Sequence, residues 1–115
     1  MKYGIMFEQG EILIVPFPFS NLEGIKQRPV LVISNSKYNK NSEDIITCGI
    51  TSNLKDSDCS VLIDNENLLK GKIPIASKIK VDKLFTLNKS IIIKKIARIN
   101  DDSLKKVKKE FINLI

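Results

Sequence analysis

An uninterrupted apolar run, Pro-Val-Leu-Val-Ile at residues 29–33, limits the possible folds of this chain more than any other segment. Apolar residues without alternation are typical of a strand that is buried on both faces. Arg28 directly precedes the run and is therefore expected at the mouth of a rigid strand. Its planar, permanently charged group of five donors matches the oxygens of a phosphate. Such a cation, in a basic chain without histidine, indicates phosphate chemistry on nucleic acid.

The length of 115 residues is enough for one domain with its own core, and we expect a single domain over residues 1–115. No apolar run approaches the roughly 20 residues of a membrane span, and the first residues lack the order of a signal peptide. We therefore expect a cytoplasmic protein without membrane association. Cys48 and Cys59 are expected as reduced core thiols, with a disulfide or a metal pair as the less favoured alternative.

The net charge of +6 is concentrated in the second half of the chain. Residues 1–60 hold six Lys/Arg against seven Asp/Glu, whereas residues 61–115 hold thirteen against six. A basic half attracts polyanions and steers their approach by its long-range field. The alternative interpretation is that the lysines serve solubility alone.

The residue pattern predicts several short strands and one terminal helix. Asn100 and the two aspartates after it provide the cap and the negative first turn of a helix, which continues with apolar residues at helical spacing. We expect a loop over residues 17–26 because prolines follow the first strand, polar turns over 35–43 and 65–71, and a strand end or helical turn over 82–87. The strands are expected at residues 11–15, 29–34, 44–51, 61–63, 73–79 and 90–96. These elements favour a mainly β fold, a small and strongly bent barrel with a C-terminal helix.

Many enzyme classes do not fit this sequence. It has no histidine, no phosphate-binding loop of the GxxxxGK[ST] type and no GxSxG elbow. Its carboxylates are scattered, so we expect no metal site and no cofactor, and a two-metal nuclease is a poor fit. Cleavage of RNA remains possible, because the substrate supplies its own nucleophile through the 2′-hydroxyl. The protein then has to align the phosphate and stabilise the transition-state charge.

Several segments resemble the MazF/PemK toxins of type II toxin–antitoxin systems, in order from about Gly10 to the C-terminal helix. They are Gly10-Glu11-Ile12, Glu23-Gly24, Arg28-Pro29-Val30-Leu31-Val32-Ile33, Ile50-Thr51-Ser52, and residues 79–99 followed by Asn100-Asp101-Asp102-Ser103-Leu104. The resemblance implies an SH3-like β-barrel and a homodimer. It also implies metal-independent cleavage of single-stranded RNA and inhibition by a cognate antitoxin protein.

The resemblance also implies roles for individual residues. Arg28 matches the catalytic arginine of the family, and Thr51 its catalytic threonine. Ser52 stands beside Thr51 as a further phosphate donor. Glu23 matches a family glutamate that can orient the arginine or bind the 2′-hydroxyl, although a solvated loop charge is the simpler interpretation of this residue alone.

A second group of residues is expected to bind RNA without taking part in the chemistry. Where the family often has a Glu-Gln pair before an aliphatic residue, this chain has Ser77-Lys78-Ile79, which exchanges a base-reading amide for a phosphate-binding charge. Two phenylalanines in the proline-rich segment can stack bases, although buried packing is the favoured alternative for both. The expected RNA-binding residues are Phe17, Phe19, Gln27, Ser52, Lys78 and Lys80.

Two other functions stay open at this level. The same barrel resembles toxins that bind DNA gyrase without cleaving anything, and a general RNA- or DNA-binding barrel would also explain the basic charge. The combination of Arg28 with Thr51 favours the nuclease.

Overall fold

The computed structural model describes residues 5–18, 25–55 and 58–115. In chain order, its elements are β1 (Glu11–Pro18), β2 (Ile25–Val32), α1 (Ser36–Asn41), β3 (Asp44–Thr51), β4 (Ser60–Ile63), the 3₁₀ turn η1 (Asn65–Asn67), β5 (Leu68–Gly71), β6 (Ser77–Asn88), the 3₁₀ turn η2 (Lys89–Ile91), β7 (Lys94–Ile99) and α2 (Asp101–Leu114).

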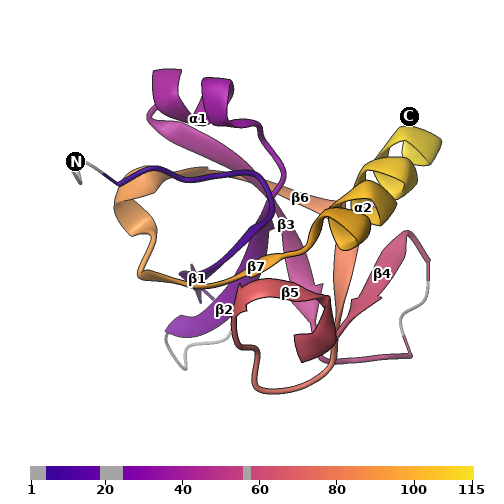
Figure 1. Ribbon diagram of the computed structural model, residues 1–115. Helices are drawn as coiled ribbons and strands as arrows, with labels where there is room; N and C mark the ends of the chain where they lie inside the picture. Colours follow the sequence, from indigo (N-terminus) through magenta and orange to yellow (C-terminus); the bar gives the residue numbers. More distant parts are fainter. Residues whose placement is uncertain (1–4, 19–24, 56–57) are drawn as a thin grey trace.

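The described strands form one antiparallel sheet in the order β4-β6-β3-β2-β1-β7-β5. The sheet is strongly curled, and α2 packs beside β4 and β6 (Figure 1). The register shifts within three of the strand pairs, β1–β7, β3–β6 and β5–β7. Because such bulges bend a strand and increase its twist, they account for the curl. The mainly β fold with a C-terminal helix is therefore confirmed.

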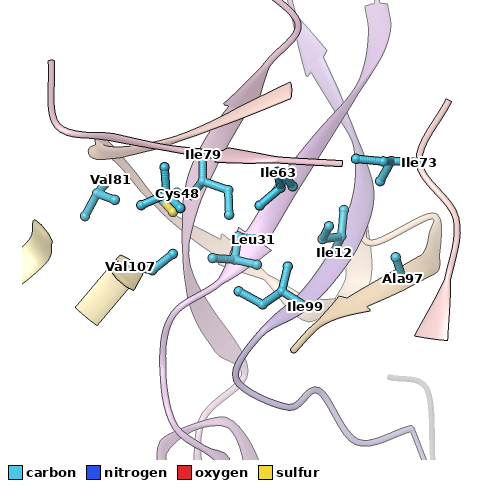
Figure 2. Packing of buried hydrophobic residues seen from close by; sticks show 11 residues of the cluster. Ile12, Leu31, Cys48, Ile63, Ile73, Ile79, Val81, Ala97, Ile99 and Val107 are labelled. Atoms are coloured by element: carbon cyan, nitrogen blue, oxygen red, sulfur yellow. The ribbon is translucent and has the colours of Figure 1, made fainter. Parts of the chain in front are cut away.

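The core lies inside the curl and under α2. Leu31 of β2 and Ile79 of β6 are fully buried, and Val107 of α2 packs against the same cluster (Figure 2). Cys48 belongs to this cluster as a free thiol, and burial raises its pKa to about 12, with a smaller contribution from the charge of Asp82. Cys59 is also free but half-buried, so the reduced state predicted for both cysteines is found and a core position only for Cys48.

The apolar run of β2 is as buried as its sequence predicts. Val30, Leu31 and Val32 have 0% exposure. They lie between β1 and β3, with Leu31 in the main cluster and the two valines in a second cluster on the other face of the strand. Residues of this strand are therefore fixed from both sides.

The C-terminal helix also agrees with its predicted cap. The Asn100 side chain accepts a hydrogen bond from the Ser103 N–H at 2.9 Å, as expected for an N-cap residue. Val107 is buried, Leu104 and Phe111 are packed on the core, and Leu114 is 44% exposed. No helix in the described part of the chain is long and apolar enough to span a membrane.

Several predicted boundaries are wrong. The first strand does not end at Val15 but continues to Pro18, because its ladder with β7 extends only to the Ile14–Lys94 pair, and a strand with one unpaired side tolerates proline. Strand β2 begins at Ile25, inside the predicted loop, because it pairs with the extended part of β1 as far as the Pro18–Ile25 pair.

Three further elements differ from the prediction. Residues predicted as turns contain helix α1 and strand β5. The predicted interruption over 82–87 is part of β6, a single strand that passes its bulge and continues to Asn88. The strands predicted at 73–79 and 90–96 begin later, at Ser77 and Lys94.

Candidate active site

An open groove of about 480 Å³ brings together residues from β1, β2, β6 and β7, from the end of β3 and from the segment between β5 and β6. Its floor and walls include apolar residues of all these segments except β6: Ile12, Ile14, Pro29, Ile50, Ile73, Pro74, Ile75 and Ile96. Its polar lining consists of Gln27, Arg28, Ser52, Lys72, Ser77 and Lys94. Among the described residues that line the groove, every charged side chain is a cation. The groove therefore suits an elongated anion with apolar surfaces.

Arg28 lies where β2 and β3 separate. The two strands pair from Val32–Thr47 to Val30–Gly49, and the same register continued by two residues would place Arg28 opposite Thr51. Pro29 stands between Arg28 and Val30, the last β2 residue that pairs with β3. Proline has no N–H to donate to the ladder. Arg28 itself is exposed and lines the groove, while the next three β2 residues after Pro29 are fully buried. Arg28 is thus an exposed side chain on a strand whose following residues are buried.

Thr51 and Ser52 lie at the end of β3. Ser52 is exposed and lines the groove. Thr51 is half-buried and does not belong to the groove lining in the described structure. Its hydroxyl oxygen accepts a hydrogen bond from the Asn53 N–H at 3.1 Å, which leaves the hydroxyl proton available for donation.

The two lysines predicted on β6 have different surroundings. Lys78 pairs with Thr51 on one side and Leu62 on the other and is half-buried. Lys80 is 5% exposed, and its Nζ donates to the Asp58 carbonyl oxygen at 2.6 Å and lies 3.7 Å from an Asp82 carboxylate oxygen. The RNA-binding role predicted for Lys80 is untested, and this geometry favours a role in holding the segment between β3 and β4.

The phenylalanines and the glutamate are the remaining predicted residues. Phe17 is half-buried and packs edge-on against Phe85, with ring centroids 4.9 Å apart. This contact agrees with the alternative of internal packing. Phe19 and Glu23 lie outside the described residues.

Two residues of the groove, Lys72 and Lys94, were not identified in the sequence. They are single lysines among many, and nothing local distinguishes them from solvated charges. Only the pairing of β7 with β1 and β5 brings them to the groove that contains Arg28.

A basic groove on a small curled sheet, with an arginine at a strand end, has the charge that suits phosphate groups. Comparison with known families gives a more definite class. Residues 8–115 match the family described as PemK-like, MazF-like toxin of type II toxin-antitoxin system. The chain belongs to this family.

Solved structures agree with the family in fold. The chain is similar to MazF in a MazE–MazF crystal structure from Deinococcus radiodurans, with a TM-score of 0.76, 22% identity, and coverage of 96% of each chain. It is also similar to an endoribonuclease from a mycobacterial species, with a TM-score of 0.75, 14% identity, and coverage of 97% of this chain and 93% of the other. A mycobacterial endoribonuclease in complex with its cognate antitoxin gives a TM-score of 0.74 at 15% identity, covering 93% and 92%.

Proposed function

We propose that this toxin is a metal-independent endoribonuclease that cleaves single-stranded RNA in the groove containing Arg28. The observation that carries the proposal is the position of Arg28, exposed in a cationic groove on a strand whose following residues are buried. Family membership and the similarity to endoribonucleases support the same activity.

The chemistry begins with attack of the RNA 2′-oxygen on the adjacent phosphorus. The new bond from phosphorus to the 2′-oxygen forms while the bond to the 5′-oxygen breaks. The 2′-hydroxyl loses its proton to a base, and the leaving 5′-oxygen takes up a proton. The products are a 2′,3′-cyclic phosphate and a 5′-hydroxyl.

The residues of the groove would act mainly on charge and alignment. Arg28 would donate to the phosphate oxygens as negative charge develops on them, because a preorganised cation stabilises the transition state more than the ground state. Ser52 lines the groove and would hold a second phosphate oxygen, with Thr51 beside it as a further donor. The lining residues described offer no carboxylate for a metal ion, which supports cleavage without one.

We propose two protein partners. The solved relatives include MazF with MazE, and a basic groove would attract an acidic antitoxin segment that covers it and excludes RNA. A homodimer is the second partner, proposed from the family alone. Both associations would take place in the cytoplasm.

The direct test is incubation of the purified protein with a long RNA in excess chelator, followed by analysis of the new ends. We expect cleavage, with cyclic phosphate and 5′-hydroxyl termini. Activity that disappears in chelator and returns with magnesium or manganese would contradict the mechanism. Complete absence of cleavage would favour a toxin that acts by binding another protein, such as DNA gyrase.

A further inference from the structure

The wall of the groove opposite Arg28 contains two lysines whose charges are not neutralised. Lys72 and Lys94 are exposed and line the groove, and neither forms a salt bridge with any residue in the described part of the chain. Two neighbouring cations of β7 do form salt bridges. Lys95 Nζ lies 3.2 Å from Glu11 Oε2, and Arg98 Nη1 lies 2.8 Å from Glu8 Oε2. The ammonium groups of Lys72 and Lys94 are therefore available to an external anion that enters the groove.

The sheet register fixes how far Lys94 lies from Arg28. Ile14 of β1 pairs with Pro29 on one side and with Lys94 on the other. Arg28 is the residue next to Pro29, and adjacent strands are about 4.8 Å apart. The two backbones are therefore separated by roughly 10 Å across the floor of the groove. Two long side chains at this separation can contact different phosphates of one nucleic-acid strand.

Lys72 is brought to the same wall by a constrained turn. Gly71 has a φ of +81°, and a Cβ at this position would lie 2.1 Å from the carbonyl oxygen of Ile96. The Lys72 N–H then donates to that same oxygen at 3.3 Å. Ile96 and Lys94 are two residues apart on β7, and both line the groove. Lys72 and Lys94 therefore converge on the same region of the groove.

Apolar side chains lie next to these lysines. Pro74 and Ile75 line the groove and are exposed, Ile75 by 59%. A nucleotide whose phosphate binds the lysines would place its base within reach of this apolar surface. Cations beside an exposed apolar surface therefore suit both the charged and the apolar part of a nucleotide.

We propose that Lys72 and Lys94 form a second phosphate subsite, which binds a phosphodiester of the RNA strand next to the one at Arg28. This inference rests on the proposed function, because it assumes that RNA occupies the groove. The subsite contributes affinity equally before and during the chemical step. It therefore changes KM and leaves the saturated rate unchanged.

The test measures binding separately from cleavage. The probe is a labelled single-stranded oligonucleotide without 2′-hydroxyls, which cannot undergo the proposed reaction, and its affinity is measured by fluorescence anisotropy over a series of salt concentrations. For the double variant Lys72→Ala/Lys94→Ala, we expect the slope of log K against log salt to decrease in magnitude by about 0.7, the value for one phosphate contact on a single strand.

Matched variants control for total charge and for folding. Lys105→Ala/Lys109→Ala removes two exposed lysines of α2 outside the groove, the same change in net charge, and should leave the slope unchanged. Lys72→Arg/Lys94→Arg keeps both charges and should also keep the slope, with thermal melting of every variant confirming the fold. A slope for Lys72→Ala/Lys94→Ala equal to that of Lys105→Ala/Lys109→Ala would overturn the subsite, as would a wild-type protein that does not bind the probe.

Cleavage measurements distinguish this inference from the proposed function. With RNA, Lys72→Ala/Lys94→Ala should raise KM and keep kcat, whereas a comparable loss of kcat would contradict a pure binding role. If the wild-type protein binds the probe and Lys72→Ala/Lys94→Ala shows the reduced slope, but no RNA is cut, the subsite is supported and the nuclease function fails.

Discussion

Replacing three glycines by alanine in turn provides a graded test of the backbone geometry. Gly71 combines a φ of +81° with a Cβ position 2.1 Å from a backbone oxygen and 2.5 Å from the Ala97 Cα. Gly10 has a φ of +93°, but a Cβ there would meet only side chains, at 3.5 Å or more. At Gly49 a Cβ would lie 3.6 Å from its nearest neighbours, which is an ordinary contact.

The expected losses of stability follow this order. Gly49→Ala should change the free energy of unfolding by less than about 1 kcal/mol and can be stabilising, because alanine reduces the entropy of the unfolded chain. Gly10→Ala should cost about 1–3 kcal/mol for the unfavourable backbone conformation. Gly71→Ala should cost more than Gly10→Ala, because backbone atoms on β7 must also move.

The measurement is urea unfolding followed by far-UV circular dichroism, since the chain has no tryptophan. At roughly 4 °C per kcal/mol for a domain of this size, thermal melting should show the same order. A Gly71→Ala protein as stable as Gly49→Ala would refute the close approach of β5 to β7. It would also remove the structural reason for the position of Lys72.

Three further predictions concern Lys80 and the two cysteines. Lys80→Met should lower the free energy of unfolding by about 1.5 kcal/mol through loss of its charged hydrogen bond to Asp58, whereas unchanged stability with weakened RNA binding would instead support the RNA contact first predicted for Lys80. In the folded protein at pH 8, a thiol reagent should modify Cys59 and leave Cys48 unmodified, and mass spectrometry counts one label natively and two after denaturation. Burial raises the pKa of Cys48 in the folded state above the value of 9.0 for the unfolded chain. The neutral thiol therefore contributes its full stability below pH 9.0, and the free energy of unfolding should decrease as the pH rises above that value. Urea unfolding at several pH values between about 8 and 10.5 measures this decrease.

The elements that were predictable from the sequence depend on local patterns. The apolar run of β2 requires burial on both faces whatever surrounds it, and Asn100 caps α2 through an atom only three residues away. Helix α1 was missed although it has a local cap, in which Asn35 Oδ1 accepts a hydrogen bond from the Tyr38 N–H, because the helix is only six residues long and its anchoring also depends on a distant contact. Asn39 is buried by donating to the Phe7 carbonyl oxygen, 32 residues earlier in the chain.

The site could be predicted in part for the same reason. Arg28 is marked by its own strand, so its place in the groove follows from neighbouring residues. Lys72 and Lys94 become part of the groove through the pairing of β7 with β1 and β5, which no short segment encodes. Lys80 was predicted to bind RNA, but it is 5% exposed, in a strand where Ile79 and Val81 on either side are also buried.

The central claim is that Arg28 acts in the cleavage of RNA, and the most direct measurement is the single-turnover rate of the wild-type protein and of Arg28→Ala at saturating RNA in chelator. Loss of a preorganised charge at a developing oxyanion should lower the rate by about 10²–10³. Arg28→Lys should restore little, because an ammonium group cannot reproduce the planar pair of donors. Circular dichroism should show unchanged folding, since the buried residues of β2 remain. A folded Arg28→Ala protein that cuts RNA at the wild-type rate would contradict the account.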